Sequence, residues 1–210
     1  MTNKLESVYF PAVLNEQLGF FYVFECEKSL KEGTAKKLNP RGLPNLYNCK
    51  SAGKSLYFVK HPEKEVPTVL FTLGKNYSAS LKTDIVHNTY IMKNPELERG
   101  EVSKYHGFNN LMIQIILDYL VPKFGVVSTD RSQTYSGKRV WEQLLEEVFH
   151  THGNYFVYLW DFSVPDAVKL TQLKSFRAFK SVEDKVYGDT ENFRKILLLV
   201  STKRLKNYQT

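Results

Sequence analysis

Three side chains of this sequence are candidates for general acid–base chemistry, and the most informative of them is His87. Imidazole exchanges protons near neutral pH, so a histidine beside a reacting group can act as a general base. His87 alternates with isoleucines in the expected strand Asp84–Met92, and its side chain therefore faces either a cleft or the apolar core. The apolar neighbours favour the core. The other two candidates, Glu65 and Glu101, are interpreted as solvated loop charges.

Patterns for metal binding and covalent catalysis are weak. His150 and His152 lie two residues apart and the chain also holds Cys26 and Cys49, but no paired spacing such as Cys-x-x-Cys supports a zinc site. Asp130 lies between an expected strand end and an expected helix start, where a carboxylate commonly caps the helix. The sequence contains neither a Gly-x-Ser-x-Gly elbow nor a Walker-type phosphate loop. We therefore expect no bound metal.

Composition places the chain among folded globular proteins. It has 210 residues, of which 42% are hydrophobic and 24% are charged, which is the ordinary range. The longest apolar run, Ile196–Val200, is far shorter than the roughly 20 residues that span a bilayer, and the first residues lack an apolar signal core. Two cysteines do not make a disulfide scaffold, which favours a reducing compartment. We expect a cytoplasmic protein without membrane association.

The net charge favours anionic partners. Lysine and arginine number 29 against 22 acidic residues, which leaves +7. Such a balance suits nucleic acid, acidic protein surfaces or phosphorylated cofactors, although +7 also lies within the ~2–8 that keeps an ordinary domain soluble. The basic residues gather between Lys28 and Lys54, where Tyr47 could stack on bases. This stretch is the expected contact for a nucleic acid or a protein partner.

The chain divides by its composition into three regions, which are a basic, loop-rich N-terminal region packed on the core (1–54), a core (55–162) and a C-terminal extension with a late strand and a basic tail (163–210). Glycine and proline punctuate Lys28–Lys54 and predict turns there. Just before this stretch, the aromatic run Phe20–Phe24 predicts a strand or a buried aromatic turn.

Hydrophobic periodicity predicts alternating strands and helices in the core. The expected elements are strands Leu56–Val59, Val66–Leu73 and Asp84–Met92, helix Phe108–Phe124, strand Gly125–Ser128, helix Ser136–Phe149 and strand Tyr155–Trp160. The first two strands are joined across His61–Glu65 as a hairpin. This order predicts an α/β fold in which a mixed β-sheet is flanked by α-helices.

The most specific pattern follows the strand Gly125–Ser128. It reads Val127-Ser128-Thr129-Asp130-Arg131-Ser132-Gln133-Thr134 and continues to Gly137 and Trp141. This run resembles GNAT-like proteins of bacteriophages, in which a strand ends in a Ser-Asp pair followed by Gln-Thr, Gly and Trp. The order of elements from Asp84 to Trp160 also looks like the core of the GNAT acyltransferase fold. The resemblance covers roughly residues 56–160.

The resemblance has consequences for topology and for compartment. It implies that Asp84–Met92 and Gly125–Ser128 lie side by side as parallel strands, joined by the helix that starts at Phe108. It also implies a viral protein, which would then be located in the cytoplasm of the host bacterium.

The resemblance further implies a site for coenzyme A. In GNAT proteins the loop before the first core helix holds the pyrophosphate on backbone amides at the helix N-terminus. The matching run here is Lys104-Tyr105-His106-Gly107-Phe108-Asn109. Lys104, Gly107, Phe108 and Asn109 are therefore the expected binding residues for acetyl-CoA or another acyl-CoA. Asn109 departs from the glycine or alanine of the family pattern, and an ordinary turn before a helix would also contain a residue such as Gly107.

Trp141 stands where the family often has a tyrosine that protonates the leaving thiolate. An indole N–H has no useful proton equilibrium near neutral pH, so Trp141 cannot replace that acid. It shares an apolar stripe with Leu144 and Leu145. We therefore expect Trp141 to pack in the core.

Two functions remain open. The first is an N-acyltransferase in which an amine attacks the thioester of an acyl-CoA directly, with proximity supplying much of the rate and with His87 as the one weak candidate for a catalytic residue. The second is the same fold as a non-catalytic binding module, a phage accessory or virion-associated factor that contacts a host protein or nucleic acid. The family resemblance favours the first, whereas Asn109 and Trp141 favour the second.

Overall fold

The structure is a computed structural model, and it describes residues 6–40, 42–43, 45–94, 108–129, 135–151, 153–163, 168–187 and 195–206. The chain forms two compact units. The first comprises Met1–Leu73 and Thr89–Tyr105, and the second comprises Gly74–Asn88 and His106–Thr210. Strands β4 (Pro67–Ser78) and β5 (Thr83–Lys93) contribute residues to both units. Within the described part of the chain, no helix combines the length and the apolar character needed to cross a membrane.

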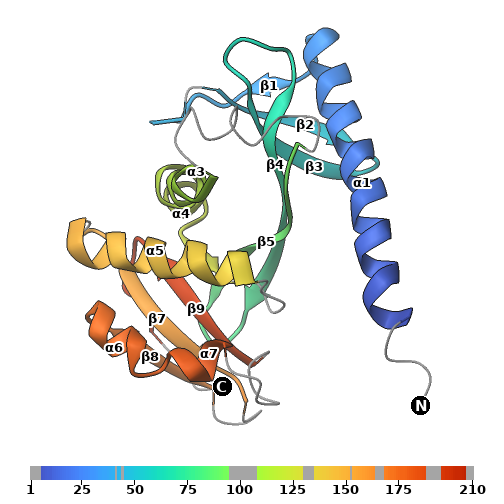
Figure 1. Cartoon of the computed structure of the whole chain (residues 1–210). Coiled ribbons are helices and arrows are strands. Elements are labelled where there is room, and N and C mark those ends of the chain that lie inside the picture. Colours follow the sequence, from blue (N-terminus) through green and yellow to red (C-terminus); the bar gives the residue numbers. More distant parts are fainter. Residues whose placement is uncertain are drawn as a thin grey trace. The chain divides into compact units, whose positions relative to one another are not determined.

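The first unit carries a long helix and an antiparallel sheet (Figure 1). Its other elements are α1 (Glu6–Lys31), β1 (Lys36–Lys37), β2 (Leu46–Ser51) and β3 (Lys54–Lys60). The strands pair in the order β1-β2-β3-β4, and each of these pairs is antiparallel. Ala52 and Gly53, with φ values of 47° and 77°, form the tight turn between β2 and β3, as two-residue hairpin loops require. The antiparallel pairing of β3 with β4 confirms the expected hairpin across His61–Glu65.

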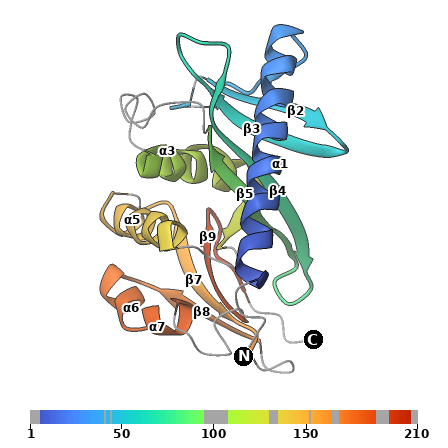
Figure 2. The same cartoon turned by 45° about the vertical axis from the view of Figure 1, so that its right-hand side comes forward.

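The C-terminal part of helix α1 packs against β2 and β3, beside which it runs in Figure 2. Its buried residues Tyr22, Val23 and Cys26 form one cluster with Cys49, Leu56, Phe58 and Leu70. Phe20, Phe21 and Phe24 are instead 51%, 44% and 61% exposed. The expectation of a strand or a buried turn at Phe20–Phe24 is therefore wrong. Five consecutive apolar residues fit a strand or a helix equally well, and this run lies in the interior of a 26-residue helix.

A glycine just after Lys31 terminates helix α1. Gly33 has a φ of 68°, and the Thr34 N–H donates to the Ser29 carbonyl over 2.9 Å, which satisfies a carbonyl of the last turn. Besides the expected turns, the stretch Lys28–Lys54 thus contains the end of α1 and the strands β1 and β2.

The second unit is a mixed sheet with helices. Its elements are α3 (Phe108–Gln114), the π-helix η1 (Ile115–Leu120), α4 (Val121–Phe124), β6 (Val126–Ser128), α5 (Tyr135–Thr151), β7 (Phe156–Asp161), β8 (Lys169–Leu173), α6 (Phe176–Lys180), α7 (Glu183–Tyr187) and β9 (Ile196–Ser201). The strands pair in the order β5-β6-β9-β7-β8. The pair β5–β6 is parallel, and β6–β9, β9–β7 and β7–β8 are antiparallel.

Most expected elements of the core are confirmed. The helix expected over Phe108–Phe124 is present as the unbroken succession of α3, η1 and α4, and the parallel pair that follows from the family resemblance is present as β5 and β6. The fold class is therefore mixed α/β, as the sequence predicts. The extension after residue 162 also contains β8, α6 and α7, which the sequence analysis does not predict.

The central strands of the second unit's sheet carry buried residues on both faces. On one face Ile85, Val126, Tyr158 and Leu199 form a cluster with Leu81. On the other face Val127, Leu198 and Val200 are fully buried, because successive side chains of a strand point to opposite sides. Helices α3 and α5 pack against each other.

Lysine and glutamate side chains link α5, α6 and α7. Glu183 on α7 forms ion pairs with Lys138 over 2.7 Å and with Lys180 over 2.8 Å, and Lys180 also reaches Glu142 over 2.9 Å. Partial burial raises the pKa of Glu183, but the hydrogen bonds from the two lysines outweigh it and lower this pKa to about 2, below its ordinary value of 4.5. The folded state therefore favours the ionised carboxylate.

We expect this cluster to make stability depend on pH in acid. Because the pKa of Glu183 is lowered on folding, its contribution is complete above about pH 4.5 and is lost as the pH falls toward about 2. The Glu183→Gln variant should therefore lose less of its thermal midpoint between these pH values than the unmodified protein does. Asp184→Asn removes an exposed neighbouring acid and serves as the control. Parallel acid profiles for the Glu183→Gln variant and the unmodified protein would contradict this prediction.

Candidate functional site

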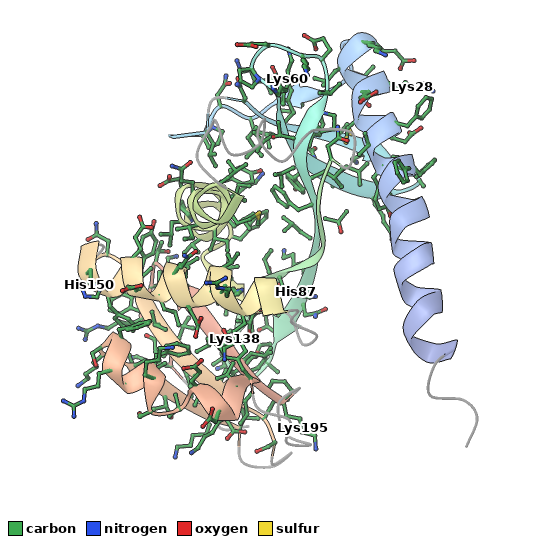
Figure 3. All side chains as sticks on the ribbon, in the orientation of Figure 1. Lys28, Lys60, His87, Lys138, His150 and Lys195 are labelled. Atoms are coloured by element: carbon green, nitrogen blue, oxygen red, sulfur yellow. The ribbon has the colours of Figure 1, made fainter. Side chains whose placement is uncertain are left out.

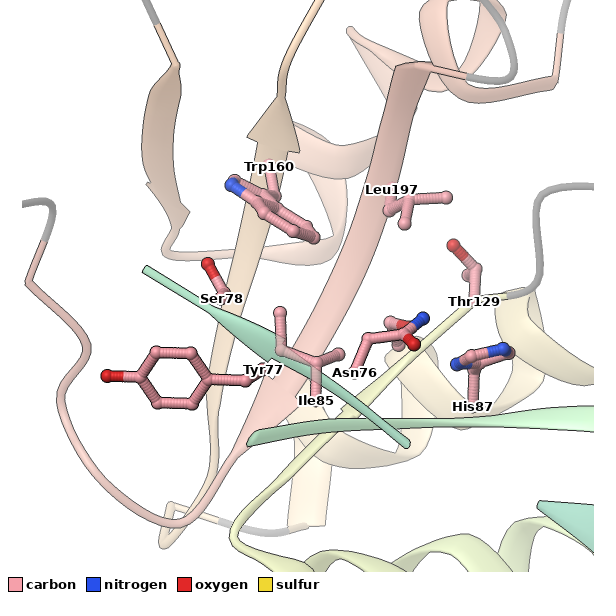
Figure 4. Close-up of a pocket in the computed structure, with 9 residues that line it drawn as sticks. Asn76, Tyr77, Ser78, Ile85, His87, Thr129, Trp160 and Leu197 are labelled. Carbon is pink, nitrogen blue, oxygen red and sulfur yellow. The ribbon is translucent and has the colours of Figure 1, made fainter. Parts of the chain in front are cut away.

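A pocket with a volume of about 390 Å³ lies within the second unit (Figure 4). It is lined by Asn76, Tyr77, Ser78, Ile85, His87, Ser128, Thr129, Trp160 and Leu197. In the view of Figure 4, His87 and Thr129 lie at one end of the pocket and Tyr77 lies at the other. The volume falls in the range of pockets that bind small molecules.

Strand register explains why these side chains meet. Ile85 and His87 lie two residues apart on β5 and so share a face of the sheet. Ser128 stands opposite His87 on β6, and Leu197 stands opposite Trp160 where β9 pairs with β7. Cross-strand neighbours point to the same side, so the sheet brings all five side chains to one face.

The pocket lies where β5 and β6 separate. Their parallel ladder has two register pairs, Val86 with Val127 and His87 with Ser128. The next residue, Thr129, stays attached to β9 instead. The Thr129 N–H donates to the Leu198 carbonyl over 2.9 Å, and the Leu198 N–H donates to the Thr129 hydroxyl over 3.1 Å. Strand β5 continues to Lys93 without a further partner on β6.

The pocket wall carries polar groups that a ligand could use. The Ser128 and Thr129 side chains are 4% and 1% exposed, and both hydroxyls belong to the lining. The indole Nε1 of Trp160 is buried and has no hydrogen-bond partner among the residues that the structure describes. Its ring centroid lies 5.1 Å from that of Phe162. A buried N–H without an acceptor costs free energy.

Charged groups near the pocket belong to an ion pair. Lys75 on β4 and Asp84 on β5 approach to 2.7 Å, and their side chains are 58% and 44% exposed. Elsewhere in the described residues, no group of three His, Cys, Asp or Glu side chains could hold a metal ion.

The structure places His87 in the pocket wall, where it is half-buried. The His87 side chain therefore faces a cleft and is not part of the apolar core. Two of the residues expected to bind coenzyme A, Lys104 and Gly107, lie outside the described residues. The other two, Phe108 and Asn109, are the first residues of α3, and their side chains lie outside the description as well.

Trp141 lies in the core, as expected, with 6% of its surface exposed. Glu65 is an exposed loop residue that pairs with Lys60, as expected for a solvated charge. Glu101 and Asp130 lie outside the described residues.

The remaining candidates do not join the pocket. His150 is exposed on α5, and its Nδ1 lies 2.7 Å from the Glu146 carbonyl oxygen one turn earlier (Figure 3). His152 lies outside the described residues. Cys26 and Cys49 contact each other, with 4.0 Å between their Sγ atoms.

Sequence reasoning missed five of the lining residues, which are Asn76, Tyr77, Ser78, Trp160 and Leu197. Trp160 and Leu197 belong to strands that the sequence predicts, but their meeting depends on the antiparallel register of β7 and β9. Asn76 and Ser78 lie on the last residues of β4, which extends beyond the expected strand end at Leu73. A period-two pattern reveals which residues share a face and leaves the neighbouring strand undetermined.

Comparisons of this chain with protein-family models, with curated proteins and with solved structures found no match.

Proposed function

We propose that this protein is an N-acyltransferase of the GNAT type, which transfers an acyl group from an acyl-CoA to an amine. The observation that carries the proposal is the parallel pair β5–β6, whose ladder ends at His87 and Ser128 where the pocket lies. The family that the sequence resembles binds its acyl donor where these two strands separate. The strand order β5-β6-β9-β7, with a helix between β5 and β6, supports the same assignment.

The residues of the pocket fit the acyl end of such a donor. Ile85, Trp160 and Leu197 supply apolar walls for the acyl group, and Thr129 supplies a polar contact. The thioester, when bound, supplies an activated acyl group.

His87 is a group of this pocket that can accept a proton near neutral pH. As the amine nitrogen bonds to the acyl carbon and the carbon–sulfur bond breaks, the amine must lose a proton. The imidazole of His87 accepts that proton as a general base. The departing thiolate takes up a proton in turn, for which Trp141 is no source, since it is a buried indole. Positioning of both substrates in the pocket supplies the rest of the rate.

A second function is favoured by one observation. The helix position at which the family carries its acid holds the core residue Trp141, so the fold could serve as a binding module without catalysis. The partner would then be a host protein or nucleic acid, held by the basic stretch Lys28–Lys54, where Lys36, Lys37 and Lys50 are exposed. This alternative makes no use of the pocket.

Titration calorimetry with acetyl-CoA separates the two functions. The acyltransferase should bind acetyl-CoA with micromolar affinity, and Gly107→Val should weaken this binding steeply without changing the thermal midpoint, because a Cβ blocks the approach of the pyrophosphate. Lys104→Ala should weaken it less, and the loss should shrink at high salt. An unmodified protein that gives no heat at millimolar acetyl-CoA would end the enzyme proposal in favour of the binding module.

A further inference from the structure

The two cysteines of the chain form a buried pair in the first unit. Cys26 on α1 and Cys49 on β2 are 23 residues apart in sequence, and their Sγ atoms lie 4.0 Å apart. The side chains are 0% and 5% exposed. Both residues belong to the Met1–Leu73 segment, whereas all residues that line the pocket belong to the other unit.

The surroundings hold this pair in place. Apolar side chains of α1, β3 and β4 enclose the two sulfurs. At the edge of the cluster, the Ser51 hydroxyl donates to Glu25 Oε2 over 2.9 Å, which fixes α1 on β2 one residue before Cys26. The two sulfurs therefore meet in a defined arrangement.

The two thiols differ in acidity. A hydrogen bond from the Cys26 thiol is the main cause that lowers the pKa of Cys49, and a second from Ser29 acts in the same direction. The same contact with Cys49, together with burial and the nearby Glu25 and Glu27 carboxylates, raises the pKa of Cys26. Cys49 is also the more accessible of the two residues, at 5% exposed against 0% for Cys26, and we therefore assign it as the sulfur that meets the oxidant first.

We propose that Cys26 and Cys49 form a reversible oxidation site, in which hydrogen peroxide or a similarly small peroxide converts the pair into a disulfide between α1 and β2. The sequence contains no third cysteine, so an intramolecular disulfide can join only these two residues. The site is independent of the acyl-transfer pocket and does not rest on the proposed function.

The chemistry balances in two steps. The Cys49 thiolate attacks one peroxide oxygen, the O–O bond breaks, and Cys49 becomes a sulfenic acid while hydroxide leaves. The Cys26 sulfur then attacks the Cys49 sulfur and displaces the second oxygen, which leaves as water with the Cys26 proton. The proton that Cys49 released on ionisation neutralises the hydroxide of the first step. Two thiols are oxidised and one peroxide is reduced to two waters. A dithiol reductant reverses the reaction.

Only a short movement separates the two states. A disulfide needs the sulfurs about 2.05 Å apart, so the present contact of 4.0 Å closes by about 2 Å. The product would cross-link α1 to the sheet and would remove freedom from the unfolded chain.

The experiment treats the purified full chain with hydrogen peroxide under native conditions and then blocks free thiols with an alkylating agent. We expect a monomer in which both cysteines resist alkylation after denaturation, and a tryptic peptide pair linked through Cys26 and Cys49. The thermal midpoint of the first unit should rise by ~6–12 °C, and dithiothreitol should reverse both changes.

Single variants test the order of the steps. Cys26→Ser should leave a sulfenic acid on Cys49 that reacts with dimedone, whereas Cys49→Ser should give much less dimedone adduct on Cys26. Cys26→Ala and Cys49→Ala repeat the comparison where serine in the apolar cluster impairs folding.

Three outcomes would overturn the proposal. One is oxidation of the unmodified protein that yields disulfide-linked dimers instead of the internal bond. Another is resistance of both thiols to peroxide until denaturant is added. The third is a dimedone adduct that persists on Cys49 although Cys26 is present, which would show that the sulfurs do not close.

Discussion

The His87→Gln variant is expected to turn over an acyl-CoA and an amine ~10²–10⁴-fold more slowly than the unmodified protein, which is the range that general base catalysis contributes. His87 lines the pocket at the point where the β5–β6 ladder ends. Glutamine keeps a hydrogen-bonding side chain of similar size but cannot accept the proton of the amine. Affinity for acetyl-CoA should therefore change little while the rate falls. Thiol release from acetyl-CoA, measured with a panel of small primary amines, gives the rate.

The control for this comparison is His150→Gln. His150 lies on α5, is exposed, and contacts a helix carbonyl oxygen with its Nδ1, so its loss should leave turnover unchanged. A His87→Gln variant that acylates the amines as fast as the unmodified protein would remove His87 from the mechanism. Calorimetry on the same variant shows whether the donor still binds.

The second large effect is on stability. Trp141→Ala should lower the free energy of unfolding by ~3–5 kcal/mol, because it removes a large side chain from a packed site and leaves a cavity. Trp141 is 6% exposed on α5, next in the helical stripe to the fully buried Leu144 and Leu145. Equilibrium unfolding in urea measures the change.

Two further variants bracket this measurement. Trp141→Phe refills much of the volume and should lose less than the alanine variant, with most of any transfer activity retained. Gln143→Ala alters an exposed position of the same helix and should stay within ~0.5 kcal/mol of the unmodified protein. A loss below about 1 kcal/mol for Trp141→Ala would contradict the assignment of Trp141 to the core.

Long periodic segments of the sequence predicted their structure well. The stripe of α5 identified a helix with one buried face, and β-branched residues identified β5, because these patterns reflect the burial that each element achieves. The parallel pairing of β5 with β6 was predicted from the family resemblance and not from the residue pattern. The prediction of a strand or a buried turn at Phe20–Phe24 was wrong. The side chains of this run do not alternate, and its three phenylalanines are exposed on a helix. Local pattern alone does not exclude that outcome.

The candidate site was less predictable than the fold. His87 was found from its chemistry, but its neighbours in the strand favoured the core, and only the end of the β6 ladder at Ser128 explains why it lines a pocket. Trp160 and Leu197 line the pocket because the register of β7 and β9 places them opposite each other. That register depends on contacts between residues distant in the sequence. Lys104 and Gly107 remain predictions from the family resemblance.

The two hydrogen bonds between Thr129 and Leu198 have a consequence for the kinetics of binding. They hold Thr129 on β9, so this part of the pocket wall is ordered before any ligand arrives. A ligand that enters a preorganised pocket meets no cost for ordering that wall. Association should then follow a single step whose rate rises in proportion to ligand concentration, without the plateau that a slow opening of the protein would impose.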